Sequence, residues 1–345
     1  MKSIVLTGGG TAGHVFGCLA LVPKLEKYFD KIYYIGTPNG IEKKLVENNL
    51  NITFIPIKTA KLVRKLTLKN VLLPLKLLKA IHDCNKILKK IKPSVIFSKG
   101  GFVSVPVTFA GHSQNIPIIL HESDISLGLA NKLAKNKAKV ICTSFDIPAQ
   151  NIKNGVCTGS PIRQELFLKD GSTKTMLGIL DNQKVLLVIG GSLGASSLNE
   201  LVWKSLDFLC EKFFVIHITG KGKQKNIKHK NYKQIEFCEH MQKLYSIANF
   251  AITRGGSNAI FELLSLKIPM IIAPLKKQTR GEQTLNAKYF CKKNYALMLE
   301  EESETELQNK INLLIQQEEK IKRNMNKYSQ NNSTEIITQI IKRFA

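Results

Sequence analysis

Two short glycine-rich segments hold the residues best suited to binding a phosphate. Residues 7–14, TGGGTAGH, follow one apolar run, and residues 190–195, GGSLGA, follow another. A glycine turn between a strand and a helix presents backbone N–H groups at the positive end of the helix dipole, where an anion is stabilised. We therefore predict a phosphate at each segment, with a plain strand-to-helix turn as the alternative.

The first segment also satisfies the dinucleotide-binding pattern G-x-G-x-x-G, through Gly8, Gly10 and Gly13. A nicotinamide site further needs an acidic residue about 20 positions on, at the end of the second strand, to bind the ribose. The second strand-like run, KIYYIG, is followed instead by threonine and proline. We therefore predict neither a nicotinamide nor any other cofactor.

Strand-like runs alternate with helical stretches along the chain, which is typical of a parallel sheet wrapped by helices. The pattern pauses at the polar segment KDGSTKT, which follows TGSPIR at 158–163, and then restarts. We predict an α/β protein with two doubly wound, Rossmann-like domains that face a cleft, residues 1–162 and 163–330, and a helix at 331–345 that packs back on the first domain. The expected strands are SIVLT, KIYYI, ITFIPI, SVIFS, IPIILH, KVICT and VCTG in the first domain, and KVLLVIGG, FFVIHITG, KQIEF, FAITRGG, IPMIIAP and YALML in the second.

The charge of the chain limits its partners. A net charge of +25 over 345 residues suits nucleic acid, an anionic membrane surface or a phosphorylated substrate. The lysines are spread along the whole chain, and there is no zinc finger, no aromatic RNA-binding motif and no compact basic arm. We therefore do not predict nucleic acid as the partner, and we keep a basic nucleic-acid-binding protein as the alternative from a different class.

The cysteines and the N-terminus indicate a reducing compartment. The seven cysteines are scattered without a C-x-x-C pair, so we expect them to be reduced. No metal site is predicted, because His121-Glu122 lacks the second histidine of H-E-x-x-H and Ile125 stands there. The chain begins directly with a strand-like run and has no apolar stretch of membrane-spanning length, so we expect it in the cytoplasm.

Seven motifs occur in order along nearly the whole chain: GGGTAGH, SKGGFVSVP, HESD with LANK, TGSPIR, GGSLGA, TRGGSNAIFE and RGEQTLNA. Together they resemble the MurG family of peripheral-membrane glycosyltransferases. The resemblance implies a GT-B fold and transfer of N-acetylglucosamine from UDP-N-acetylglucosamine to the 4-hydroxyl of MurNAc in lipid I, which forms lipid II for peptidoglycan. It also implies inversion at the anomeric carbon, no obligatory metal, and other cell-wall synthesis proteins as partners. A GT-B transferase for another lipid acceptor, such as diacylglycerol, is the alternative.

The resemblance also implies which residues bind the two substrates. Glu262 would bind the ribose hydroxyls, since a carboxylate accepts two hydrogen bonds, and Cys238 with Phe237 would offer main-chain groups to the uracil. The donor set is Thr11, Ala12, Gly13, Asp124, Arg163, Ser192, Cys238, Ser257, Asn258, Glu262 and Gln283. The acceptor set is Gly9, Gly10, Gly100, Gly101, Phe102, Glu122 and Asn131.

Two residues are candidates for the catalytic base. His14 stands at the start of the first helix, and the positive helix end lowers the pKa of an imidazole and keeps it able to accept a proton. Asp124 is the alternative, because a carboxylate could take the proton or only hydrogen-bond the sugar. Asp124 stands where many family members have asparagine. Two other departures from the family are Ala12, in place of a glycine, and Gly17, where a proline often follows HVF.

Residues 58–83, KTAKLVRKLTLKNVLLPLKLLKAIHD, mix leucines with lysines. A basic apolar surface of this kind suits an anionic membrane. A core helix with a solvated lysine face is the alternative, but the leucines are too many for one buried stripe. We predict a peripheral protein on the cytoplasmic face of the cell membrane, held by Leu72, Leu73, Leu75, Leu77, Leu78 and Ile81 together with Lys61, Arg64, Lys65, Lys69, Lys76 and Lys79.

Overall fold

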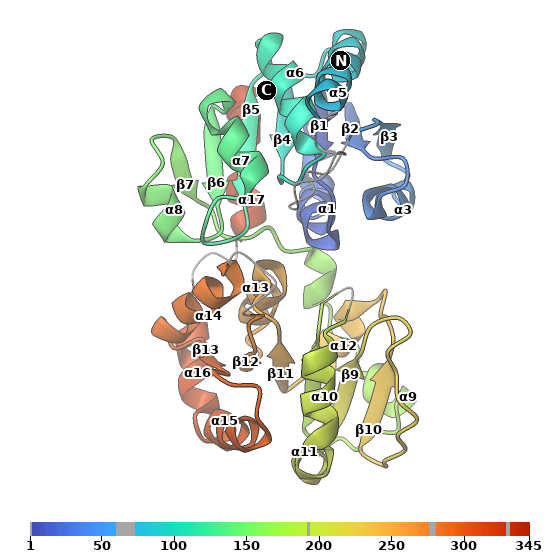
Figure 1. Ribbon diagram of the computed structural model, residues 1–345, viewed down its shortest axis with the longest axis vertical. Coiled ribbons are helices and arrows are strands. Elements are labelled where there is room, and N and C mark those ends of the chain that lie inside the picture. The colour runs from blue at the N-terminus through green and yellow to red at the C-terminus, as the bar shows by residue number, and fades with distance from the viewer. Residues whose placement is uncertain (1, 60–72, 192–193, 276–280, 329–331) are drawn as a thin grey trace. The chain divides into compact units, whose positions relative to one another are not determined.

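The chain folds into two compact units (Figure 1). The computed structural model describes residues 2–59, 73–191, 194–275, 281–328 and 332–345. Unit 1 comprises Met1–Arg163 with Asn332–Ala345, and unit 2 comprises Gln164–Asn331. Each unit holds its own sheet, in which every neighbouring pair of strands is parallel.

Unit 1 contains a seven-stranded sheet in the order β3-β2-β1-β4-β5-β6-β7. Its strands are β1 (Ser3–Thr7), β2 (Lys31–Gly36), β3 (Ile52–Pro56), β4 (Val95–Ser98), β5 (Ile118–Glu122), β6 (Val140–Thr143) and β7 (Gly155–Cys157). Its helices are α1 (Ala12–Leu19), α2 (Val22–Leu25), α3 (Ile41–Glu47), α5 (Leu73–Ile91), α6 (Ser104–Ser113), α7 (Leu129–Ala134), the 3₁₀ helix η1 (Lys135–Lys137), α8 (Asp146–Gln150) and α17 (Ser333–Phe344).

Successive residues of the unit 1 strands enter two different cores. On β1, Ile4 and Leu6 face one cluster, whereas Val5 faces the other. This alternation follows from the two-residue period of a strand, and burial on both faces explains why the central residues of β1, Ile4 to Leu6, are all apolar. Helices α1, α2 and α17 cover the first face, and α5 and α6 cover the second. Ile337 and Ile341 of α17, red in Figure 1, are fully buried in the first core.

Unit 2 repeats the same architecture with six strands in the order β10-β9-β8-β11-β12-β13. Its strands are β8 (Val185–Ile189), β9 (Phe214–Ile218), β10 (Tyr232–Ile235), β11 (Phe250–Thr253), β12 (Met270–Ile272) and β13 (Ala296–Met298). Its helices are the 3₁₀ helix η2 (Gln164–Phe167), α9 (Ser172–Met176), α10 (Ser196–Lys204), α11 (Leu206–Lys212), α12 (Met241–Ile247), α13 (Ser257–Ser265), α14 (Glu282–Lys292), α15 (Glu304–Gln316) and α16 (Glu318–Asn326).

The strand order determines where each unit can bind a ligand. In unit 1 the order reverses between β1 and β4, and in unit 2 it reverses between β8 and β11. Ligands of doubly wound sheets bind at the carboxyl ends of the strands beside such a reversal. In both units glycine-rich segments follow these two strands, so the glycines predicted from the sequence lie at the position that the topology favours.

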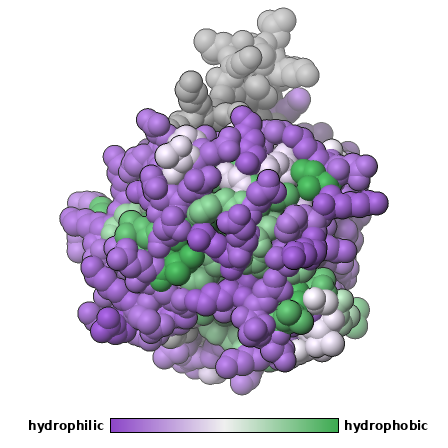
Figure 2. Space-filling model, turned by 90° about the horizontal axis from the view of Figure 1, so that it is seen from below, coloured by the Kyte–Doolittle hydropathy of each residue, from purple (hydrophilic) through white to green (hydrophobic). Residues whose placement is uncertain are grey.

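The strands expected from the sequence are all present, with ends that differ by a few residues. The predominantly hydrophilic surface agrees with the many charged residues of the sequence. Figure 2 shows a face on which hydrophilic side chains predominate and hydrophobic ones form separate patches, as expected for a chain with 51 lysines and arginines.

Candidate active site

Two glycine turns of unit 1 are in direct contact. Gly101, after β4, has a φ of +84°, and a Cβ added there would lie 2.2 Å from the backbone oxygen of Gly9, after β1. Only glycine fits both the conformation and this close approach. A Cβ on Gly10 would lie 3.2 Å from the Phe102 ring, so Phe102 packs against the first turn. The structure therefore brings together the predicted acceptor residues Gly9, Gly10, Gly100, Gly101 and Phe102.

The hydrogen bonds of His14 fix its tautomer. Nδ1 lies 2.9 Å from the backbone oxygen of Gly9 and 3.1 Å from Oγ1 of Thr11. A carbonyl oxygen can only accept, so Nδ1 carries the proton and Nε2 holds a free electron pair. Burial, and then the charge of Lys99, lowers the pKa of the imidazole, while Gly9, Asp124 and Glu42 act in the opposite sense. His14 is thus neutral with Nε2 as the acceptor, as a general base requires.

Glu122 organises the loop that follows β5. Its carboxylate accepts hydrogen bonds from the backbone N–H groups of Asp124 at 3.1 Å and Gly128 at 2.8 Å, and from Nδ2 of Asn131 at 2.9 Å. Burial raises the pKa of Glu122, and the hydrogen bond from Gly128 opposes this. Gly100 lies against Asn131, because a Cβ there would be 3.2 Å from Nδ2. Glu122 and Asn131 therefore connect the loop of Asp124 to the second glycine turn.

The predicted donor residues of unit 1 surround the first turn of α1. Thr11 is the N-cap residue of α1 and makes no side-chain capping hydrogen bond, while Ala12 and Gly13 are the next residues. Arg163, the last residue of the first segment of unit 1, stacks on the Phe16 ring of α1 at 4.1 Å from the ring centroid. Together with Asp124, these residues lie in unit 1, whereas the remaining donor candidates lie in unit 2.

In unit 2 the turn after β8 packs against the end of β9. Gly194 has a φ of +69°, and a Cβ there would lie 2.0 Å from the Thr219 backbone oxygen. Helix α10 begins two residues after Gly194, and the N–H groups at the start of a helix can bind an anion. The predicted donor residue Ser192 lies outside the described residues.

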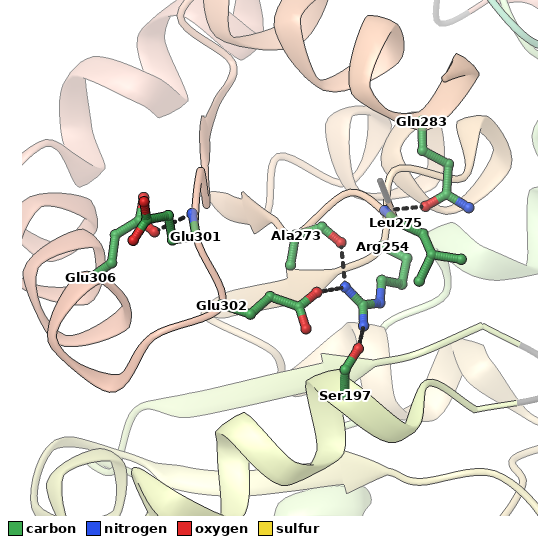
Figure 3. A network of polar contacts seen from close by, with 8 residues as sticks. All are labelled: Ser197, Arg254, Ala273, Leu275, Gln283, Glu301, Glu302 and Glu306. Carbon is green, nitrogen blue, oxygen red and sulfur yellow. Dashed lines mark hydrogen bonds and ion pairs between the residues drawn. The ribbon is translucent and has the colours of Figure 1, made fainter. Parts of the chain in front are cut away.

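A buried arginine that the sequence analysis did not single out links the start of α10 to the segments after β12 and before α15 (Figure 3). Arg254, directly after β11, donates from Nη2 to Oγ of Ser197 at 2.6 Å and from Nη1 to the Ala273 oxygen at 2.9 Å. It also forms an ion pair with Glu302. The start of α10 is thereby held next to the ends of β11 and β12.

The predicted donor residues after β11 lie on or beside α13. Ser257 is the first residue of this helix, Asn258 follows it, and Glu262 lies on the next turn. The Tyr245 hydroxyl of α12 donates to Oε2 of Glu262 at 2.9 Å. This hydrogen bond holds the carboxylate of Glu262 toward α12.

Two further donor candidates lie elsewhere in unit 2. Oε1 of Gln283 accepts from the Leu275 N–H at 3.0 Å (Figure 3). Its backbone packs on Gly255, where a Cβ would be 2.5 Å from the Gln283 oxygen. Cys238 is partly buried, which raises the pKa of its thiol, and Phe237 beside it is exposed. Gln283 therefore lies beside the start of α13, whereas Cys238 stands in the segment that precedes α12.

The described residues bring together no group of three or more His, Cys, Asp or Glu side chains that could hold a metal ion. Among the helices of this part of the chain, none combines the length and the apolar character needed to cross a membrane.

Comparison with known proteins defines the class. The N-terminal domain of glycosyltransferase family 28 matches residues 4–143, and the C-terminal domain of that family matches residues 185–340. With two Rossmann-like sheets and glycine turns at both reversals of strand order, the chain is a glycosyltransferase of the GT-B fold.

The similarity to individual proteins is more specific. One relative comes from Clostridium botulinum (strain Kyoto / Type A2) and is named "UDP-N-acetylglucosamine--N-acetylmuramyl-(pentapeptide) pyrophosphoryl-undecaprenol N-acetylglucosamine transferase". It is 44% identical to this chain, and the alignment covers 100% of this chain and 99% of the relative. The protein of the same name from Clostridium tetani (strain Massachusetts / E88) is 43% identical over 99% of this chain and 98% of its own length. The chain belongs to this family, the MurG family. The crystal structure of Acinetobacter baumannii MurG has the same fold, with a TM-score of 0.75, 24% identity, and coverage of 99% of this chain and 100% of that chain.

Proposed function

We propose that this protein transfers N-acetylglucosamine from UDP-N-acetylglucosamine to the 4-hydroxyl of MurNAc in lipid I, forming lipid II and releasing UDP. The observation that carries the proposal is the 44% identity, over the full length of both units, to transferases named for this reaction. This identity favours the transferase over the alternative of a nucleic-acid-binding protein.

In this reaction a carbon–oxygen bond forms as another breaks. The 4-hydroxyl oxygen of MurNAc attacks C1 of N-acetylglucosamine, the bond from C1 to the diphosphate oxygen breaks, and its electron pair leaves with UDP. Attack from the face opposite the leaving group inverts the anomeric carbon. We assign the hydroxyl proton to Nε2 of His14, whose tautomer supports this role. Asp124, whose backbone N–H donates to the Glu122 carboxylate, remains the alternative base.

We assign the donor nucleotide to unit 2. The negative charge that develops on the departing diphosphate is stabilised by N–H groups and helix dipoles that are already oriented. Gly191, Gly194 and the start of α10, which Arg254 contacts through Ser197, are suited to the diphosphate. Glu262 is assigned to the ribose hydroxyls and the main chain of Cys238 to the uracil. The remaining residues of the donor proposal are Thr11, Ala12, Gly13, Asp124, Arg163, Ser192, Ser257, Asn258 and Gln283.

A transfer assay tests the function. The purified protein is incubated with labelled UDP-N-acetylglucosamine and, in parallel, a short-chain lipid I analogue or diacylglycerol, without added metal. We expect label to enter only the lipid I analogue. Transfer to diacylglycerol would contradict the proposed acceptor, and transfer to neither lipid would contradict the proposed reaction.

We further propose that α5 holds unit 1 on the anionic cytoplasmic face of the membrane. The buried side of α5 consists of Ala80, Cys84 and Leu88. Leu75 and Leu78 are 64% and 62% exposed, and the lysines beside them are exposed as well. An exposed leucine pair among lysines favours insertion into the headgroup region of an anionic bilayer. Residues 60–72 of the predicted membrane segment lie outside the described residues.

Replacing both leucines tests this surface. Leu75→Gln/Leu78→Gln should lower the affinity for phosphatidylglycerol-containing vesicles about tenfold or more, because each leucine buried in the bilayer contributes about 1.5 to 3 kcal/mol. The matched control is Leu168→Gln/Leu180→Gln in unit 2, whose leucines are 64% and 68% exposed. Flotation with vesicles measures the affinity. Equal losses in both double variants would show that α5 has no special role.

A further inference from the structure

Lys99 is a buried cation beneath the first glycine turn of unit 1. It directly follows β4, only 1% of its surface is exposed, and its N–H donates to the Thr7 oxygen at 2.9 Å. Nζ donates to Oγ of Ser123 at 2.7 Å and lies 2.9 Å from Nδ1 of His121. Within the described part of the chain, no carboxylate forms an ion pair with this ammonium group.

The neighbouring histidine cannot share the charge of Lys99. Nε2 of His121 lies 3.0 Å from the Gly159 oxygen, which can only accept, so Nε2 carries the proton and Nδ1 accepts from Nζ. Burial holds the pKa of His121 well below its usual value. His121 is therefore neutral, and the local positive charge belongs to Lys99.

The side chain of Lys99 runs along the helix that carries His14. A Cβ on Gly17 would lie 2.3 Å from Cε and 2.9 Å from Nζ of Lys99. Residues three apart lie on the same side of a helix, so His14 and Gly17 are neighbours on α1. A Cβ on Gly8 would lie 3.1 Å from Cβ of Lys99 and 3.5 Å from Cβ of His14. Gly17, where the family often has proline, thus leaves room for the ammonium group.

Burial of this cation is unfavourable for the fold. It lowers the pKa of Lys99 to about 8, and an apolar side chain of similar volume would avoid the desolvation. The corresponding cation of unit 2, Arg254, also precedes two glycines after the fourth strand of its sheet, but it is paired with Glu302. Lys99 forms no such ion pair with a described residue, and this contrast indicates that its charge serves the site.

We propose that Lys99 is a positioning residue whose buried charge keeps Nε2 of His14 free of a proton. The proposal rests on the role of His14 proposed above. A nearby positive charge disfavours a second one, so the imidazole stays neutral. Glu42 and Asp124 favour the imidazolium, and burial and then the charge of Lys99 oppose it. The groups that act on Lys99 are Cys18, Glu122, Asp124 and Cys142, each of which favours its charged form.

Histidine NMR titration tests the coupling without relying on catalysis. Removing the cation in Lys99→Met should raise the titration midpoint of His14. The NMR signal of His14 is assigned as the signal that is missing from the spectrum of His14→Ala. The matched control is Lys139→Met, an exposed lysine of unit 1. An unchanged midpoint in Lys99→Met would overturn the proposal even if His14 proved to be the base. Conversely, a raised midpoint with a fully active His14→Ala enzyme would overturn only the role of His14.

The pH profile of kcat/KM separates this role from a structural one. At pH 6 we expect Lys99→Met to lose about tenfold relative to the wild type, since one nearby charge moves a pKa by about 1 to 3 units. Above the pKa of Lys99, about 8, both enzymes lack the charge and should converge. A loss that is equal at all pH values would indicate structural damage or an effect on the acceptor and would contradict the proposal. If Lys99→Met does not fold, the wild-type His14 signal should still shift a second time near pH 8, and its absence would also contradict the proposal.

Discussion

His14→Ala is expected to lower kcat by about 10²- to 10⁴-fold at pH 7.5, which is the range that general acid–base catalysis contributes. The reason is the tautomer: Nδ1 donates to the Gly9 oxygen at 2.9 Å, so Nε2 is the atom that can take the proton of the acceptor hydroxyl. The KM for UDP-N-acetylglucosamine should change little, because the nucleotide is assigned to unit 2. Steady-state kinetics with a saturating lipid I analogue measures both constants.

His112→Ala is the matched control, since His112 is an exposed histidine of unit 1 on α6. It should retain wild-type activity. If His14→Ala keeps activity within about tenfold while Asp124→Ala loses 10²-fold or more, the proton goes to the carboxylate instead. Comparing the two variants therefore decides between the two candidate bases.

Glu262→Ala is expected to raise the KM for UDP-N-acetylglucosamine about 30- to 150-fold, with a smaller effect on the KM for the acceptor. A charged acceptor of hydrogen bonds contributes about 2 to 3 kcal/mol to binding, and this carboxylate is assigned to the ribose hydroxyls. Tyr245→Phe, which removes the hydroxyl that donates to Oε2 at 2.9 Å, should give a smaller change in the same direction, because Tyr245 only orients the carboxylate.

Glu211→Ala, at an exposed glutamate of α11 in unit 2, is the control and should leave the KM unchanged. A deoxyribose analogue of the donor makes the test more specific. If Glu262 binds the ribose hydroxyls, the analogue should reduce the difference between the wild type and Glu262→Ala. An undiminished difference would place the carboxylate away from the ribose.

The sheets could be predicted because their strands are buried on both faces. The runs IVL at 4–6 and VLLVI at 185–189 are apolar at every position, and the glycine segments that follow mark where each strand ends. His14, Gly101 and Glu262 were singled out from the sequence because each belongs to a motif, and their roles in the site stay predictions. Their contacts could not be predicted. Gly101 and Gly9, for example, lie in turns that follow different strands and are far apart in the sequence, and only the fold brings them together.

Lys99 and Arg254 were missed because nothing in a composition of 51 lysines and arginines distinguishes a buried cation from an exposed one. A signal was nevertheless present. Each of the two stands directly after an apolar run and before a pair of glycines, in FSKGG and in ITRGG. A cation at this point lies at the carboxyl end of a central strand. The depth at which Lys99 is buried depends on Gly17, which is distant in the sequence.

Helix α17 has a consequence for how the protein is made. It completes the first core of unit 1 with Ile337 and Ile341, and Glu335 pairs with Lys24 at 2.5 Å. Unit 2 is one continuous stretch of chain inserted between the two segments of unit 1. Domains fold as units while the chain emerges from the ribosome. Here the N-terminal segment of unit 1 is synthesised first, but its first core is complete only after α17 has been synthesised. Unit 2 can therefore finish folding before α17 completes the first core of unit 1, although most of unit 1 is synthesised first.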